Sequence, residues 1–262
     1  MKIGFVGGGA LAESVIKGIV GKLADANDIY VSERYVARRE ELVQKYKINA
    51  ADGVDSFISD IEFLIIAVKP KDAISALNEI SSKVNQNTII TYTVAGLKLA
   101  VVEEYFKSHS VIRVMPNVAI SVSEGMNVIT IGKNVKPSEV EIVKNFFSAL
   151  GKCLEVEEEL MDAVTGLSGS GPAFAFLMID ALSDGGVAVG LPRAKAIELA
   201  AQTLLGAAKM VLETGEHPDV LRDKVTSPAG TTIEGVRMLE KCGVRSALIE
   251  AVIAATEKSK SL

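Results

Sequence analysis

Short apolar runs rich in β-branched residues alternate with amphipathic stretches from residue 1 to about residue 156. Such alternation is typical of βαβ units, in which crossover helices cover the faces of a mostly parallel sheet. Strands are predicted near residues 2–6, 29–32, 63–68, 88–91, 111–115, 127–131 and 152–156. The first part of the chain is therefore expected to form an α/β domain.

The strand pattern ends near residue 161, and the remaining sequence is rich in Ala, Leu, Gly and Met at helical spacing. We therefore predict two domains, an α/β domain over residues 1–157 and an all-helical domain over residues 158–262. The two predicted domains meet at the acidic run of residues 155–159. We expect this run to be the solvated start of a helix.

One predicted helix of the second domain has more apolar surface than that domain can bury by itself. Residues 173–182 read AFAFLMIDAL and are apolar nearly all round, so several faces of this helix must be buried. A helical domain of roughly 100 residues covers such a helix poorly on its own. The sequence therefore predicts an intertwined homodimer that forms through the helical domain.

Composition and charge argue against several classes of partner. Hydrophobic residues make up 48% of the chain and charged residues 23%, which is typical of a globular protein. The net charge is −5 and the Lys and Arg residues form no stripe, so we expect no nucleic-acid partner. The longest uncharged stretch, residues 163–179, is interrupted by Gly, Ser and Pro, so we expect no membrane partner.

The sequence contains neither an export signal nor a metal-ligand pattern. The first apolar run is too short for a signal peptide and the two cysteines are far apart, so we expect a cytoplasmic protein. His109 and His217 stand alone and are expected at the surface or at helix caps, so no metal site is predicted. Ser168 and Ser170 lack a nucleophile elbow, which argues against hydrolase chemistry.

Three glycines, Gly7 to Gly9, follow the first predicted strand and open an amphipathic helix. Gly7 would permit the tight turn, Gly9 would let the backbone approach a pyrophosphate, and Ala12 replaces the third glycine of the dinucleotide fingerprint. The N–H groups at the helix start would then face the anion. We predict dinucleotide binding here; the alternative is a structural turn between strand and helix.

At the end of the second predicted strand, Ser32, Glu33 and Arg34 stand where ribose recognition is expected. Glu33 would accept a hydrogen bond from a free 2′-hydroxyl and favour NAD. Ser32 and Arg34 would instead bind a 2′-phosphate and favour NADP. A solvated strand end is the third interpretation. We expect NADPH to be preferred and NADH to be an alternative cofactor.

Two clusters of small residues lie in the second part of the chain. Residues 226–234 (TSPAGTTIE) precede an amphipathic helix, and their N–H and O–H groups could hold a substrate carboxylate. Thr231 and Glu234 also have the spacing of a capping box, and taken alone these residues favour an ordinary helix cap. Residues 166–172 (GLSGSGP) predict a loop that either packs against a cofactor or lets helices cross closely.

Together these motifs resemble the pyrroline-5-carboxylate reductase family over nearly the whole chain. The likeness is carried by TSPAGTT at 226–232, by segments 162–173, 184–186 and 190–193, and by AVKP at 67–70 and RVMPN at 113–117. The family often has Thr-Pro where this chain has Val118 and Ala119, and often Tyr where it has Phe174. Neither departure removes a group expected to act in catalysis.

The resemblance implies NAD(P)H-dependent reduction of 1-pyrroline-5-carboxylate to L-proline, the last step of proline biosynthesis. It implies a Rossmann domain followed by a helical dimerisation domain and, in many members, rings of dimers. By this likeness the cyclic imino acid would be bound by Ser227, Gly230, Thr231 and Thr232, with the catalytic hydroxyl of Thr232 near the ring nitrogen. The cofactor would be lined by Gly7, Gly9, Ala10, Leu11, Ser32, Arg34, Val68, Lys69, Pro70, Ala95, Gly96 and Asn117.

Two other functions would use some of the same features. A 3-hydroxyacid dehydrogenase of this two-domain type normally has a catalytic Lys one turn into the helix after its Gly-x-Gly loop, where this chain has Ala175. Without that ammonium group, alcohol oxidation lacks its base. A nicotinamide-sensing protein without turnover would need the glycine fingerprint but not the loop around Thr232.

Overall fold

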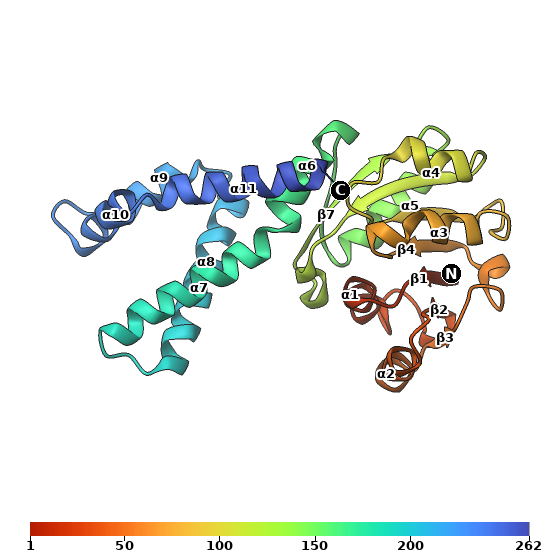
Figure 1. Cartoon of the computed structure of the whole chain (residues 1–262). Helices are drawn as coiled ribbons and strands as arrows, with labels where there is room; N and C mark the ends of the chain where they lie inside the picture. Colours follow the sequence, from red (N-terminus) through yellow and green to blue (C-terminus); the bar gives the residue numbers. More distant parts are fainter. Residues whose placement is uncertain (262) are drawn as a thin grey trace. The chain divides into compact units, whose positions relative to one another are not determined.

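The computed structural model describes residues 1–261. They form two compact units, of which the first contains Met1–Ser170 and the end of the chain from Ala254, and the second contains Gly171–Ile253. The first unit holds all the strands of the described chain, whereas the second is helical (Figure 1). The predicted fold class, a mostly parallel sheet with helices followed by helices alone, is confirmed.

An eight-stranded sheet forms the centre of the first unit, in the order β3-β2-β1-β4-β5-β6-β7-β8. Its strands are β1 (Ile3–Val6), β2 (Ile29–Ser32), β3 (Asn49–Ala51), β4 (Phe63–Ile66), β5 (Ile89–Tyr92), β6 (Ser110–Met115), β7 (Gly125–Ile131) and β8 (Gly151–Glu155). Neighbouring strands are parallel except for β6 and β7. Because β2 and β4 flank β1, the order in which the chain adds strands reverses beside β1, where α/β sheets commonly bind ligands.

Each of the seven predicted strands is present, and the prediction missed β3. This strand has only three residues, and its sequence Asn-Ala-Ala has little intrinsic preference for a strand. It forms because Asn49 lies opposite Tyr30 and Ala51 opposite Ser32, so the edge of β2 supplies its hydrogen bonds. Such a strand forms by pairing with its neighbour, so the local sequence does not predict it.

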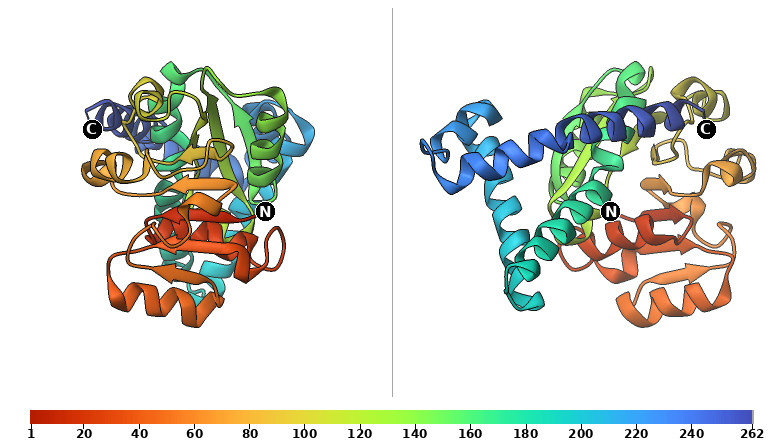
Figure 2. Two further views of the ribbon diagram at one scale, coloured as in Figure 1. Left: turned by 90° about the vertical axis from the view of Figure 1, so that its right-hand side faces the viewer. Right: turned by 60° about the vertical axis from the view of Figure 1, so that its left-hand side comes forward.

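Helices cover both faces of the sheet (Figure 2). They are α1 (Ala10–Ile19), α2 (Val36–Tyr46), α3 (Pro70–Ile80), α4 (Leu99–Tyr105), α5 (Pro137–Ser148) and α6 (Met161–Val164), with 3-10 turns η1 (Ala26–Asp28), η2 (Ile58–Asp60), η3 (Val118–Val122) and η4 (Glu158–Leu160) and a π turn η5 (Thr165–Gly169). Core residues of α1, α2 and α5 cluster on one face and those of α3 and α4 on the other. Phe5 and Val6 are both buried but belong to opposite faces, which explains why β1 reads as a continuous apolar run.

The segment 166–172 was predicted to be a loop, and this is wrong. Residues Thr165–Gly169 form the π turn η5, and Gly171 begins the next helix. The hydroxyls of Thr165 and Ser168 donate to the carbonyls four residues earlier, Met161 and Val164, at 2.8 and 3.1 Å. Bonds of this kind satisfy hydroxyls inside a helix, so a Gly- and Ser-rich sequence can remain helical here.

The acidic run was predicted to be solvated, and for Glu158 this is wrong. Its Oε1 accepts hydrogen bonds from the Leu99 N–H at 2.6 Å and from Arg113 at 3.3 Å. Arg113 is only 3% exposed, so Glu158 is the counter-ion of a buried charge on β6. The compact units separate at Ser170 and not at this run. The domain boundary between residues 157 and 158 stays a prediction.

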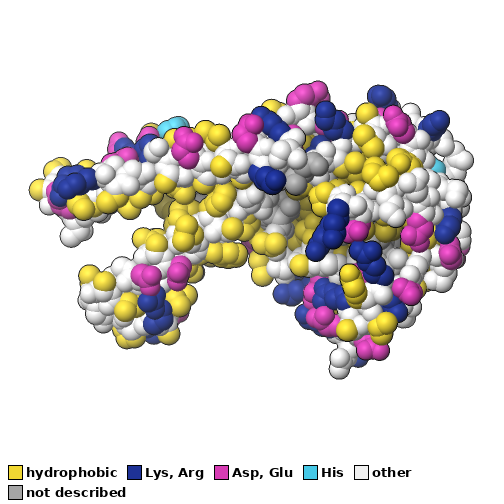
Figure 3. All heavy atoms as spheres, in the orientation of Figure 1, with side chains coloured by type: hydrophobic (Ala, Val, Ile, Leu, Met, Phe, Trp, Pro, Cys, Tyr) yellow, Lys and Arg dark blue, Asp and Glu magenta, His cyan; other side chains and the backbone are white. Residues whose placement is uncertain are grey.

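The second unit has almost no apolar interior within one chain. Its helices are α7 (Gly171–Ala188), α8 (Arg193–Thr214), α9 (Pro218–Lys224), α10 (Thr231–Lys241) and α11 (Val244–Lys260), of which the last continues into the first unit. Among its described residues only Ser183, Ala196, Ala200 and Leu221 are buried. Large apolar side chains such as Phe176, Leu177 and Val189 are instead 63%, 69% and 83% exposed, and Figure 3 shows such side chains along these helices. This surface needs cover from another molecule.

The described chain contains no helix that is both long and apolar enough to cross a membrane.

Candidate cofactor and substrate sites

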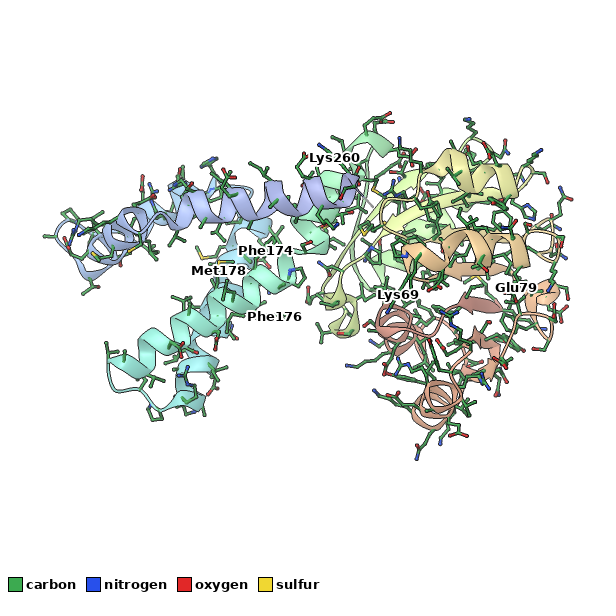
Figure 4. The ribbon with its side chains drawn as sticks, in the orientation of Figure 1. Lys69, Glu79, Phe174, Phe176, Met178 and Lys260 are labelled. Atoms are coloured by element: carbon green, nitrogen blue, oxygen red, sulfur yellow. The ribbon has the colours of Figure 1, made fainter. Side chains whose placement is uncertain are left out.

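A cavity of about 430 Å³ opens beside the carboxyl ends of β1, β2 and β4. Of the residues predicted to bind the cofactor, its lining contains Gly7, Gly9, Ser32, Arg34, Val68 and Lys69. Lys69 precedes α3 and Glu79, also in the lining, lies near the other end of that helix (Figure 4). The cavity therefore lies at the point where the strand order reverses, where a dinucleotide is expected.

The other predicted cofactor residues lie outside this lining. Ala10 and Leu11 form the first turn of α1, and Pro70 that of α3. Ala95 and Gly96 follow β5, where Gly96 has a φ of +73°. Their role in cofactor binding stays a prediction.

Asn117 is also outside the lining, and its side chain is already engaged within the protein. Its Oδ1 accepts from the Ala119 and Met126 N–H groups at 3.2 and 3.3 Å, and its Nδ2 donates to the Ser168 carbonyl at 3.0 Å. These bonds cap η3 and tie it to β7 and η5. Asn117 therefore has a structural function, and any contact with cofactor would be additional.

The glycine loop has the geometry that a dinucleotide site needs. Gly7 has a φ of +97°, its N–H donates to the Ser32 carbonyl at 2.9 Å, and a Cβ atom there would lie 2.7 Å from the Ala67 carbonyl oxygen. At Gly9 a Cβ would meet no atom within 4 Å, so the backbone is open to a ligand. Within residues 1–261 no side chain caps the start of α1. Its first N–H groups are free to bind an anion.

Glu33 and Arg34, the two charged residues that follow β2, have different partners in the structure. Glu33 Oε2 accepts from the Gly8 N–H at 3.0 Å, and Oε1 accepts from the Tyr35 N–H at 2.9 Å. The side chain of Arg34 is 64% exposed in the cavity lining, and its only ion pair among described residues is with Asp72, at 3.3 Å. The hydrogen bond and charge of Asp72 raise the pKa of Arg34, which stays a cation. Glu33 is thus engaged by backbone, while Arg34 is available to an anion.

Sequence reasoning missed several residues of this site. Tyr35, Arg38, Lys71 and Asp72 also line the cavity. Arg38 lies on α2, 30 residues from Gly8, yet its Nε donates to the Gly8 carbonyl at 2.8 Å. Nothing in the pattern of α2 distinguishes Arg38 from the neighbouring Arg39, because the distinction depends on which face of the helix meets the glycine loop.

Glu13 on α1 is held by three side chains of α2. It accepts hydrogen bonds from Lys45 at 2.6 Å, from Arg38 at 2.5 Å and from Tyr46 at 2.9 Å. The bonds from Lys45 and then Arg38 lower the pKa of Glu13 to about 2. A carboxyl whose pKa is lower in the folded than in the unfolded protein stabilises the fold at any pH above its unfolded-state pKa. That contribution is lost as the pH falls toward its folded-state pKa.

We therefore expect the free energy of unfolding to decrease as the pH falls from 4.5, the ordinary value for this carboxyl, toward about 2. The variant Glu13→Gln should show a weaker decrease over this range because its amide does not titrate. Urea denaturation at a series of pH values measures both slopes. Glu40→Gln, which changes an exposed carboxyl on α2, is the matched control. Equal slopes in Glu13→Gln and the parent would contradict the prediction.

The loop predicted to bind substrate lies between α9 and α10. The capping box predicted from Thr231 and Glu234 is wrong, because the N-cap of α10 is Gly230 and no side chain of the described residues caps this helix. The hydroxyls of Ser227, Thr231 and Thr232 make no hydrogen bond within residues 1–261, and all three residues are exposed. Their hydroxyls and the first N–H groups of α10 are therefore available to a ligand.

The backbone of this loop is held by its own residues. Ala229 has a φ of +56° although it is not a glycine, and the Gly230 N–H donates to the Ser227 carbonyl at 3.1 Å. A Cβ at residue 230 would collide with Ser227 Oγ, so a larger residue at this position would require the Ser227 side chain to rotate away. A left-handed Ala is an uncommon conformation, and such positions concentrate at functional sites.

Neither histidine belongs to these sites. Nδ1 of His217 accepts from the Asp219 N–H at 3.2 Å and caps α9, as predicted. His109 packs edge-on against Phe106 before β6. Among the described residues, no group of three or more His, Cys, Asp or Glu side chains is placed to hold a metal ion.

Two family models match the sequence. One, described as pyrroline-5-carboxylate reductase dimerisation, matches residues 158–262, and the other, described as NADP oxidoreductase, coenzyme F420-dependent, matches residues 2–95. The first part of the chain is thus an NADP-binding type of domain. The dimerisation domain implies a homodimer, which agrees with the uncovered apolar surface of the second unit.

Full-length relatives match as well. The chain is 43% identical to a pyrroline-5-carboxylate reductase of Arabidopsis thaliana over 262 residues, which covers 100% of this chain and 95% of the relative. It is 44% identical to one of Synechocystis over 263 residues, which covers 100% and 98%. The crystal structure of a pyrroline carboxylate reductase of Plasmodium falciparum with NADP bound superimposes with a TM-score of 0.90 at 29% identity, covering 100% and 97%. The chain belongs to the pyrroline-5-carboxylate reductase family.

Proposed function

We propose that this protein, an NAD(P)-dependent oxidoreductase of the pyrroline-5-carboxylate reductase family, reduces 1-pyrroline-5-carboxylate to L-proline and uses NADPH in preference to NADH. The observation that carries the proposal is the start of α10, which no side chain of residues 1–261 caps and where the exposed hydroxyls of Ser227, Thr231 and Thr232 have no hydrogen-bond partner within that range. Family membership supports the reaction, and the cavity beside β1 supports a dinucleotide as its second reactant.

The residues of the loop suit a cyclic imino acid. The first N–H groups of α10, with the hydroxyls of Ser227 and Thr231, would hold the carboxylate, since a helix N-terminus favours an anion. The Thr232 hydroxyl would form a hydrogen bond at the ring nitrogen. The bound NADPH supplies the hydride that reduces C5 of the imine, and the nitrogen keeps its proton as the amine of proline. A protonated imine is already electrophilic, so positioning supplies most of the rate and no strong acid is needed.

The residues of the cavity fit the proposed cofactor. Gly7 provides the left-handed turn, Gly9 leaves the backbone accessible, and the start of α1 offers free N–H groups. Arg34 and Ser32 would hold a 2′-phosphate, and this preference is supported by the engagement of Glu33 with the Gly8 and Tyr35 amides.

Replacement of Arg34 with alanine is expected to raise the Kd for NADPH by about tenfold, because one charge-assisted contact with the 2′-phosphate is lost. The Kd for NADH should stay unchanged, since that cofactor has no such phosphate. Fluorescence titration with each nucleotide measures this, and Arg34→Lys should retain part of the preference. Equal weakening of both nucleotides would show that Arg34 does not read the 2′-phosphate.

We further propose that dimers form through α7 to α11 and assemble into a larger ring in the cytoplasm. The exposed apolar side chains of these helices and the match to a dimerisation family model support the dimer. The ring is proposed from the family resemblance alone. Multi-angle light scattering of the purified protein gives the number of subunits. A stable monomer would contradict both levels of assembly.

The test of the proposed reaction follows the absorbance of reduced nicotinamide at 340 nm with the purified protein and 1-pyrroline-5-carboxylate, with NADPH and NADH compared. Oxidation that forms proline stoichiometrically would establish the reaction and rank the cofactors. Tight binding of nucleotide without oxidation would favour a sensing function. Oxidation of a 3-hydroxyacid would favour the dehydrogenase alternative, which Ala175 disfavours because it provides no base.

A further inference from the structure

Two charged side chains hold the backbone of the glycine loop on both sides of Gly8. Glu33, which follows β2, accepts from the Gly8 N–H at 3.0 Å. Arg38, on α2, donates from Nε to the Gly8 carbonyl at 2.8 Å. The N–H belongs to the peptide group between Gly7 and Gly8, and the carbonyl belongs to the one between Gly8 and Gly9. Two consecutive peptide planes are therefore fixed by side chains from outside the loop.

The orientation of the second plane determines where the Gly9 N–H points. A trans peptide places its C=O and N–H on opposite sides. When Arg38 holds the Gly8 carbonyl, the Gly9 N–H must point the other way. Gly9 lies in the cavity lining, and a Cβ there would meet nothing within 4 Å. Glycines without such restraints sample many conformations, and ordering them on binding would lower the affinity for a ligand.

Glu33 and Arg38, which together we call the clamp, are themselves held in place by other groups. Glu33 uses its second oxygen to accept from the Tyr35 N–H at 2.9 Å. Arg38 is 22% exposed and forms ion pairs through its remaining nitrogens with Glu13 at 2.5 Å and Glu41 at 2.7 Å. A Cβ on Gly8 would lie 2.9 Å from Leu42 Cδ1, so the loop lies directly against α2. The clamp thus connects α1, α2 and the end of β2.

We propose that Glu33 and Arg38 are positioning residues that fix the peptide planes on either side of Gly8 and so aim the Gly9 N–H at the pyrophosphate of the cofactor. This inference rests on the proposed nicotinamide cofactor and assigns Glu33 a different task from ribose recognition. Because NADPH and NADH share the pyrophosphate, the clamp serves both equally. Arg34 and Ser32 would distinguish them through the 2′-phosphate.

The experiment measures the Kd for NADPH and for NADH by fluorescence titration in Glu33→Gln and Arg38→Gln. The first variant cannot accept from both amides, because the NH₂ group of its new side chain is a donor, and the second variant loses the guanidinium. Each variant should bind both nucleotides about tenfold more weakly, by the same factor for each. At saturating cofactor kcat should be nearly unchanged, whereas KM for the cofactor should rise. Arg38→Lys, which can still donate to the Gly8 carbonyl, should recover part of the affinity.

The matched control is Glu40→Gln, an exposed carboxyl of α2 that makes no hydrogen bond among the described residues, and it should change neither Kd. Circular dichroism and thermal unfolding check that each variant folds; if Arg38→Gln does not, Glu33→Gln and Arg38→Lys carry the test. Selective weakening of NADH in Glu33→Gln would overturn the inference in favour of ribose recognition, and unchanged Kd values would overturn the clamp. A parent protein that binds both nucleotides without reducing the imine contradicts the proposed reaction alone, whereas one that binds neither overturns both.

Discussion

Replacement of Thr232 with alanine is expected to lower kcat/KM for 1-pyrroline-5-carboxylate by about 100-fold. The hydroxyl of Thr232 lies in the first turn of α10 and makes no hydrogen bond within residues 1–261. The fold therefore does not depend on it, and the loss should appear in catalysis rather than in stability. A hydroxyl that forms its hydrogen bond mainly in the transition state affects kcat, whereas one that binds the ground state equally well affects KM.

Steady-state kinetics at saturating cofactor measures the effect on Thr232→Ala, with Thr232→Ser and Thr203→Ala as comparisons. Serine restores the hydroxyl and should recover most of the activity. Thr203 is an exposed threonine of α8 whose hydroxyl donates to the Leu199 carbonyl, so its replacement should leave kcat/KM within about twofold of the parent. An unchanged kcat/KM in Thr232→Ala would remove this residue from the catalytic site.

Alanine at Gly7 should lower the stability of the protein, whereas alanine at Gly9 should leave the stability unchanged and weaken nucleotide binding. At Gly7, alanine would have to adopt a φ of +97° with its Cβ 2.7 Å from the Ala67 carbonyl oxygen. We expect this to lower the free energy of unfolding by at least about 2 kcal/mol. At Gly9, φ is −69° and a Cβ would meet nothing within 4 Å, so the stability should change by less than about 0.5 kcal/mol.

For binding, Gly9→Ala should raise the Kd for both NADPH and NADH by at least about tenfold, because its methyl group would occupy space that a pyrophosphate needs. Urea denaturation and fluorescence titration of the two variants separate the effects. Gly53→Ala is the control, since that glycine also has nothing within 4 Å of a Cβ and lies outside the cavity lining. Normal nucleotide binding by Gly9→Ala would exclude close approach of the cofactor at this position.

The variants on either side of Gly8 also bear on the clamp. Gly7→Ala distorts the peptide that Glu33 holds, whereas Gly9→Ala leaves both clamped planes intact and only fills the space before them. A lower stability in Gly7→Ala would therefore indicate a misplaced loop. An unchanged stability in Gly9→Ala would indicate a loop that is correctly placed but obstructed by the added methyl group.

Local sequence determined the fold class, the seven strands that carry apolar runs, and the turn at Gly7. Periodicity reports which residues must be buried, and strands such as β1, with both faces covered, leave a strong apolar signal. The glycine fingerprint was equally local, because a left-handed φ followed by a helix start needs only neighbouring residues. The resemblance to a known family then supplied the reaction and the roles of residues that chemistry alone left ambiguous.

Only the tertiary structure determined which polar groups form hydrogen bonds within the protein and which are available to a ligand. Glu33 and Thr231 each had two interpretations in the sequence, since a carboxylate or hydroxyl shows no partner until the backbone around it is folded. The fold brings Glu33 to the Gly8 N–H across 25 residues and Arg38 to the Gly8 carbonyl across 30. Among the described residues it leaves the start of α10 without a side-chain cap. Hydrogen bonds depend on distance and direction between groups far apart in the chain, and neither composition nor periodicity carries that information.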